Sequence, residues 1–260
     1  MAYTTVDNPE LYFQTKLYTG NGGTQSITLD GSENMQPDWV WIKSRGDTSW
    51  HRSLDVVRGA TKELYQNESN AENTEANGLT SFDSDGFSIG SNSGYNGNTV
   101  NFASWNWLAG GSGSSNTDGD LTVTSLSVNQ TAGFSIGKIT NGFTSTGSNS
   151  ETVGHGLGAV PKMIILKNTE ATSNWFIYHA GIGNTNRIFL NTTDASSSST
   201  IWNNTTPTSS VWSVRGGDFG TGEDVVFYAF AEKKGYSKFG SYVGNGSSDG
   251  TYVHLGFKPA

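Results

Sequence analysis

Two short runs of the sequence combine flat aromatic rings with side chains that can donate hydrogen bonds. The first run is Trp50, His51 and Arg52, and the second contains Trp175, Tyr178 and His179. Aromatic faces can stack on the apolar faces of sugars, while His and Arg donate hydrogen bonds to hydroxyl or carbonyl oxygens. These six residues are therefore candidates for a sugar- or peptide-binding platform. The competing interpretation, which we favour, is a core tryptophan with an ordinary histidine at the end of its strand.

Acidic residues form a second kind of candidate site. Asp83-Ser84-Asp85-Gly86 has the composition of the opening of a calcium loop, in which carboxylate oxygens gather around the ion. The run lacks the later acidic ligands of such a loop, and a turn between two strands explains it better. Asp218, Glu223 and Asp224 form an acidic patch in a glycine-rich stretch, which is typical of a solvated loop. We expect no metal site.

Catalysis by paired carboxylates would require two acidic side chains facing each other across a cleft. Four glutamates are available for such a pair, and nothing in their spacing brings any two together: Glu151, Glu170, Glu223 and Glu232. We therefore expect a protein that is not an enzyme, with no catalytic residue and no cofactor.

Composition excludes several classes of protein. The 260 residues include 15 Lys and Arg against 23 Asp and Glu, a net charge of −8, which argues against binding nucleic acid through a basic face. The absence of cysteine excludes disulfides and thiolate metal sites. No apolar stretch approaches the ~20 residues of a membrane-spanning helix, and Met1–Gln14 lacks the basic start and apolar run of a signal peptide. With 8 Trp, 10 Tyr and 13 Phe, the chain has the aromatics to fold.

The sequence segments that would position these residues occur in two similar copies. Five blocks recur in the same order at nearly constant offset: 37–43 with 161–167, Trp50 with Trp175, 64–67 with 188–191, 87–89 with 212–214, and 105–107 with 228–230. Such a pattern indicates an internal duplication. The recurring aromatics, among them Trp41, Trp107 and Tyr228, are expected to form two separate cores.

A third copy begins near the end of the chain, because 242–246 repeats the pattern of 18–22. Either the chain belongs to a longer array, or residues 236–260 complete the second copy; we expect the latter. The predicted organisation is an N-terminal arm (1–16), module 1 (17–110), a Gly/Ser-rich connector with an edge strand (111–133), module 2 (134–235) and the closing segment (236–260).

Most segments have the pattern of short strands. The apolar runs 40–42 and 163–166 are typical of buried strands, and turn residues recur every eight to twelve positions. Helix is expected only at 60–73. The sequence therefore predicts an all-β protein of two tandem antiparallel β-sandwich modules with a jelly-roll-like arrangement.

Several of these blocks together resemble a known family. The segments that show the resemblance are, in order, 36–43, 57–62, 82–87, 154–158 and 236–242. The chain resembles repeat-containing, largely hypothetical proteins encoded by bacteriophages, particularly phages of marine bacteria. The resemblance implies a virion component with concanavalin- or laminin-G-like β-sandwich modules, and it implies no catalytic residues.

From this resemblance we expect a virion protein. The preferred interpretation is a tail fibre or other appendage that presents its modules to glycans of the host surface. The alternative is a capsid decoration or tail-assembly protein that binds other virion proteins and has no receptor role. Apolar residues in the N-terminal segment could form a docking arm or a capping strand of module 1: Tyr3, Leu11, Tyr12 and Phe13. The resemblance also implies a homo-oligomer, for which we expect a trimer, without nucleic acid or membrane insertion.

Overall fold

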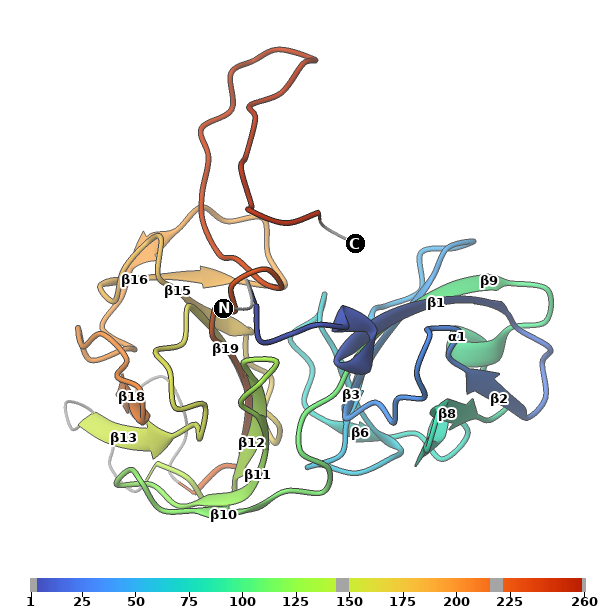
Figure 1. Cartoon of the computed structure of the whole chain (residues 1–260). Coiled ribbons are helices and arrows are strands. Elements are labelled where there is room, and N and C mark those ends of the chain that lie inside the picture. The colour runs from blue at the N-terminus through green and yellow to red at the C-terminus, as the bar shows by residue number, and fades with distance from the viewer. Residues whose placement is uncertain (1–3, 144–149, 216–221, 259–260) are drawn as a thin grey trace.

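Antiparallel strands make up nearly all of the regular structure (Figure 1). The computed structural model describes residues 4–143, 150–215 and 222–258. Within these ranges the helical segments are short, namely η1 (Pro9–Leu11) and α1 (Ser93–Asn96). The expected all-β class is therefore confirmed.

The helix expected over 60–73 is wrong. This stretch instead forms β5 (Lys62–Tyr65), turns, and β6 (Asn73–Thr74). Pairing of β5 with β4 (Arg52–Asp55) buries Leu64 completely, and such tertiary burial overrides a weak helical composition.

Module 1 is a sandwich of a six-stranded and a three-stranded sheet. The larger sheet has the order β1-β9-β3-β4-β5-β6, and the smaller has the order β2-β8-β7. The remaining strands of this module are β1 (Phe13–Thr19), β2 (Gln25–Thr28), β3 (Trp39–Ser44), β7 (Leu79–Asp83), β8 (Gly86–Ile89) and β9 (Asn101–Trp107).

Module 2 follows the same plan with a larger main sheet. Its order is β10-β11-β12-β19-β14-β15-β16-β17, and a second sheet pairs β13 with β18. The strands are β10 (Ser114–Asn116), β11 (Val123–Asn129), β12 (Phe134–Ile139), β13 (Ser150–Gly154), β14 (Met163–Asn168), β15 (Phe176–His179), β16 (Asn186–Phe189), β17 (Ser197–Ser198), β18 (Val211–Arg215) and β19 (Val225–Phe230).

The two main sheets share one strand order. Six neighbouring strands of module 2 correspond one by one to the six strands of the main sheet of module 1. Their order is β12-β19-β14-β15-β16-β17 in module 2 and β1-β9-β3-β4-β5-β6 in module 1. This agreement supports the duplication inferred from the sequence blocks, which stays an inference. Module 2 differs by two additional strands, β10 and β11, at the edge beyond β12.

Alternation along each strand divides the apolar residues between two surfaces. In β9, Phe102 points into the core of module 1, whereas Trp105 and Trp107 lie on the opposite face. In β19, Phe227 points into the core of module 2, and Tyr228 lies on the opposite face. Each sandwich therefore has a core of its own between its two sheets.

The outer faces of the two main sheets pack against each other and form a third core. Trp39 of module 1 and Trp175 and Tyr228 of module 2 are buried in this shared cluster, with Trp41 and Trp107 partly buried against it. The expectation that the recurring aromatics form two separate cores is thus wrong. Alternation along β9 and β19 puts Trp107 and Tyr228 on the outer faces of their sheets, and local sequence does not show that these faces cover each other.

Module boundaries differ from the expected ones at three places. β1 begins at Phe13, inside the expected N-terminal arm. The Gly/Ser-rich connector contributes β10 and β11 to module 2. The closing segment forms a C-terminal arm (residues 236–258) that runs out from the body and back (Figure 1), and its exposed part adds no strand to module 2.

Candidate functional site

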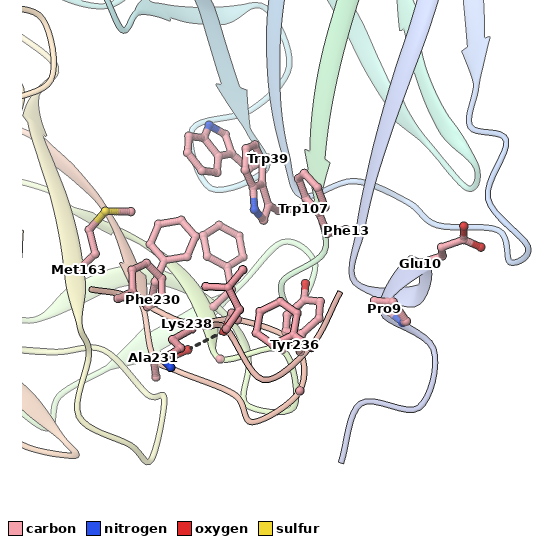
Figure 2. A pocket seen from close by; sticks show the side chains of 18 of the residues that line it. Pro9, Glu10, Phe13, Trp39, Trp107, Met163, Phe230, Ala231, Tyr236 and Lys238 are labelled. Carbon is pink, nitrogen blue, oxygen red and sulfur yellow. Dashed lines mark hydrogen bonds between the residues drawn. The ribbon is translucent and has the colours of Figure 1, made fainter. Parts of the chain in front are cut away.

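A pocket of about 600 Å³ lies where the two modules and the base of the C-terminal arm meet. Its walls come from β3 and β9 of module 1, from β12, β14 and β19 of module 2, and from both ends of the arm. Figure 2 shows the lining side chains converging from these elements on one apolar space. We call this space the inter-module pocket.

Aromatic rings build its inner wall, because neighbouring strands present their alternate residues on the same face. The rings of Trp39 and Trp107 stack with centroids 4.3 Å apart, and Phe13 lies 4.9 Å from Trp107. On the module 2 side, the rings of Phe134 and Phe230 lie 4.8 Å apart. Trp39 is fully buried, so it forms both the floor of the pocket and part of the shared core.

Two of the charged residues that line the pocket, Glu10 and Lys238, have hydrogen-bond partners outside it. Glu10 accepts a hydrogen bond of 2.7 Å from the backbone N–H of Ser32, which lowers the pKa of that carboxyl, and its carboxylate points away from the aromatic rings (Figure 2). The Nζ of Lys238 donates a 2.9 Å hydrogen bond to the carbonyl of His254. The pocket therefore offers an apolar surface rather than a set of reactive groups.

Both ends of the C-terminal arm are anchored at this pocket. Tyr236 packs edge-to-face on Tyr12 at 6.2 Å, and burial raises its pKa above the usual range of a phenol. Phe239 lies 6.1 Å from Phe230, and the returning limb brings Phe257 to the pocket wall. The arm thus starts and ends as part of the pocket.

A buried polar network joins the modules behind Trp39. The carboxylate of Asp55 accepts from the Nε of Arg58 at 2.6 Å and from the hydroxyl of Tyr228 at 2.7 Å. Arg58 also donates to Glu72 and to the carbonyls of Ser53 and Lys62. The Asp55 charge holds the pKa of Arg58 above its ordinary value, although burial acts the other way. This network fixes the geometry of the pocket floor.

The first predicted platform does not form a common surface. Trp50 is 43% exposed and its ring lies 4.8 Å from that of Tyr65. His51 turns inward, where its Nδ1 accepts from the Nε1 of Trp41 at 3.0 Å and burial lowers its pKa. Arg52 pairs with the buried Glu63 at 2.8 Å. Only Trp50 of the three is free to meet a ligand.

The second predicted platform is mostly inside the protein. Trp175 is fully buried between the modules, and its Nε1 donates to the carbonyls of Tyr65 and Glu68. Tyr178 is buried in the core of module 2, where its ring meets Trp202. His179 is half-buried, and its Nδ1 accepts from the N–H of Gly181. The core interpretation therefore describes these residues better than the platform does.

The residues of the expected docking arm belong to the body where the structure describes them. Leu11 ends η1, Tyr12 packs on Tyr236, and Phe13 starts β1 beside Trp107. Tyr3 lies outside the described residues. The capping interpretation fits this arrangement, with the addition that Phe13 lines the pocket.

The acidic candidates have structural partners. Asp83 accepts from the hydroxyls of Ser81 and Ser88 at the β7–β8 turn, so the run is a hairpin turn. Glu170 accepts from the N–H of Asp224, and Glu232 from that of Phe239. Glu151 is buried, and Glu223 accepts from Asn168. Asp218 lies outside the described residues. Across the described ranges, no three His, Cys, Asp or Glu side chains gather in a way that could hold a metal ion.

Two Gly-Phe-Ser-Ile-Gly runs, 86–90 and 133–137, have the spacing of a serine-hydrolase nucleophile elbow. That motif requires a sharp turn from a strand into a helix, and here both serines lie within antiparallel strands. Ser88 in β8 bonds to Asp83 and Ser26, and Ser135 in β12 is buried. Neither run forms an elbow.

Sequence reasoning missed most of the pocket. Trp39 could have been found, because it alternates with the core residues of β3 and shares the outer face of that strand with Trp41. Tyr236 and Phe239 carried no such signal, since their contribution depends on how the C-terminal arm folds over the modules.

The helices in the described part of the chain are all too short to cross a membrane. Comparison with known proteins gives one result. A family model described as a domain of unknown function, DUF7483, matches residues 8–260. Searches of curated proteins and of solved structures gave no match. Because the match extends over nearly the whole chain, this protein belongs to the DUF7483 family.

Proposed function

We propose that this protein is a structural protein of a bacteriophage particle and that it binds other proteins of the particle through the inter-module pocket. The sequence blocks that resemble phage repeat proteins support its place in a particle. The role within the particle rests on one observation, the aromatic character of the pocket between Trp39, Trp107, Phe134 and Phe230.

The chemistry of the pocket favours a protein segment over a sugar. Each sugar hydroxyl that is buried without a hydrogen-bond partner costs about 1–3 kcal/mol. Glu10 and Lys238 are engaged elsewhere, and the Nε1 of Trp39 already donates to Ser53. An aliphatic or aromatic side chain gains from the same surface at about 25 cal/mol per Å² of apolar area removed from water. A partner that inserts such a side chain is the best fit.

The experiment is incorporation into particles of the phage that encodes the chain. We would produce particles with the wild-type protein, with Trp41→Ala in the pocket wall, and with Trp50→Ala as the control outside it. Quantitative mass spectrometry of purified particles should show about a tenfold loss for Trp41→Ala, equivalent to 1.4 kcal/mol, and none for Trp50→Ala. Absence of the wild-type protein from the particles would contradict the proposal.

A second function, attachment of an appendage to host-surface glycans, is favoured by Trp50. Its exposed ring beside Tyr65 is the one part of the predicted platforms that faces solvent as an aromatic surface. A glycan array probed with wild-type protein and with Trp50→Ala tests this role. Binding that is lost in Trp50→Ala and kept in Trp41→Ala supports attachment. If the wild-type protein binds no glycan on the array, the attachment role is contradicted and only the protein-binding role remains.

A further inference from the structure

We propose that the C-terminal arm of one copy pairs as an added strand with the free edge of β1 in a second copy. This inference goes beyond the pocket function, because it assigns a self-association surface and names both of its halves. The donor is the stretch around Tyr242 and Val243, and the acceptor is β1 (Phe13–Thr19).

The exposed part of the C-terminal arm carries large apolar side chains that lie outside the cores of the protein, although Tyr252 meets His254 within the arm. Tyr242 is 69% exposed, Val243 86% and Tyr252 84%. The two limbs are held together near the tip, where Thr251 donates to the carbonyl of Val243 at 2.7 Å and Asn245 donates to that of Asp249. Such a projecting apolar segment marks a contact site.

The beginning of the same sequence pattern lies in a strand elsewhere in this protein. Residues 242–246 repeat the pattern of 18–22, in which Tyr18 and Thr19 end β1 and residues 20–22 follow the strand. There Tyr18 is buried, its hydroxyl donates to the carbonyl of Tyr95 at 2.9 Å, and its ring stacks on Phe102. Tyr242 and Val243 therefore correspond to two strand residues of module 1 but have no strand partner within the described chain.

Within the described residues, no further strand pairs with the outer edge of β1, whereas the corresponding edge of module 2 is covered by two additional strands. β1 is the terminal strand of its sheet, whereas its counterpart β12 carries β11 and then β10 on the corresponding side. Leu17 of β1 is 62% exposed. An open edge strand of seven residues presents unpaired backbone groups to any extended segment that meets it.

Charge favours the same pairing. Residues 7–33, which surround β1, contain Lys16 against four acidic residues and have a net charge of −3. The C-terminal arm contains Lys238 and Lys258 against Asp249 and has a net charge of +1. The arm therefore has a net charge opposite to that of the segment around β1, which favours their association.

Donor and acceptor are different surfaces, so the contact is head-to-tail. Copies joined in this way form a closed ring or an open filament, depending on the rotation between them. The expected trimer is one such ring.

Absence of cysteine makes a direct test possible, because every introduced thiol is the only one in its chain. Val243→Cys protein would be mixed with Leu17→Cys protein under mild oxidation. Side chains that face each other across paired strands have Cβ atoms about 4.5–5.5 Å apart, close enough for a disulfide. Thr15→Cys and Thr19→Cys, on the same face of β1, cover other registers. Val160→Cys, exposed in module 2, replaces the acceptor in the control mixture.

We expect cross-linked heterodimers from at least one β1 position, formed about ten times faster than with Val160→Cys. Light scattering of the wild-type chain should show mass that rises with concentration, and Val243→Asp or Leu17→Asp should weaken this association about tenfold, or 1.4 kcal/mol. Equal cross-linking with the control, or a monomer up to the solubility limit, would overturn the proposal. Because the test uses the purified chain alone, its failure is distinguishable from failure to enter particles.

Discussion

The hydroxyl of Tyr228 in module 2 donates a hydrogen bond of 2.7 Å to the carboxylate of Asp55 in module 1, across 173 positions of sequence. Arg58 holds the same carboxylate oxygen at 2.6 Å. Burial raises the pKa of Tyr228 above that of a free phenol, which favours the protonated hydroxyl that donates this hydrogen bond. This contact ties the modules together directly beneath the inter-module pocket.

Removing that hydroxyl should weaken the connection between the modules. Tyr228→Phe leaves a buried carboxylate with one donor fewer, which should lower the free energy of unfolding by about 1–3 kcal/mol. Urea unfolding followed by tryptophan fluorescence measures the loss. Tyr252→Phe, in the exposed part of the C-terminal arm, is the matched control and should unfold like the wild type. Equal free energies of unfolding for the two variants would contradict a stabilising role for the hydrogen bond between Tyr228 and Asp55.

Lys167 should give the protein an unusual rise in stability above neutral pH. Burial lowers the pKa of its ammonium group to about 8, with a further contribution from the Arg58 charge. Its Nζ donates to the carbonyls of Ser69, Asn168 and Ala171. Below pH 8 the lysine is protonated in both states, and the cost of burying the charge is fully present. Between pH 8 and 10.5 the unfolded state binds more protons, so stability rises with pH.

The measurement is the urea midpoint at several pH values from 7 to about 10, compared between wild type and Lys167→Met. At about 1.4 kcal/mol per pH unit, the wild type should gain about 2 kcal/mol relative to the variant across that window. Lys43→Met alters the corresponding lysine of module 1 and leaves Lys167 in place, so it should keep the wild-type pH dependence. A difference between wild type and Lys167→Met that stays constant with pH would exclude the lowered pKa.

The inter-module pocket should bind small apolar probes. A naphthalene-type fluorophore in solution should report an apolar environment when it occupies a space of about 600 Å³ walled by Trp41 and Trp107. Trp41→Ala should weaken probe binding about tenfold, equivalent to 1.4 kcal/mol, by removing one wall. Trp50→Ala, outside the pocket, should leave the affinity unchanged. Probe binding that is insensitive to Trp41 would place the apolar site elsewhere.

Gly86 should tolerate no side chain. It lies at the β7–β8 turn with φ of +111°, and a Cβ added there would come within 2.0 Å of the carbonyl oxygen of Ile27. Gly86→Ala should therefore lower the free energy of unfolding by at least about 1–3 kcal/mol, the usual cost of such backbone strain. Gly240→Ala, where the added Cβ meets nothing within 4 Å, should be neutral. Thermal unfolding of the two variants is sufficient to compare them.

Much of the fold could be predicted from local patterns, because alternation and turn residues act within a few positions. The strands at 39–44 and 163–168 were predicted from the apolar runs 40–42 and 163–166. The site could not be predicted in this way. The position of Trp175 depends on a carbonyl of Tyr65, 110 residues away, and the pocket depends on the packing of one sheet on another. The helix expected at 60–73 failed for the same reason, since the pairing with β4 is not visible locally.

The pairing of β1 with β9, and of β12 with β19, sets the order in which the protein can form during its synthesis. In each main sheet an early strand pairs with the last one of that sheet to be synthesised. The main sheet of module 1 is therefore complete only after β9, which ends at Trp107, has left the ribosome. The face that carries Trp39 then waits for Tyr228, about 120 residues later, which takes about 6–25 s at 5–20 residues per second. During that interval the aromatic rings on the outer face of module 1 lack the module 2 surface that covers them in the folded protein, and exposed apolar surface of this kind favours aggregation.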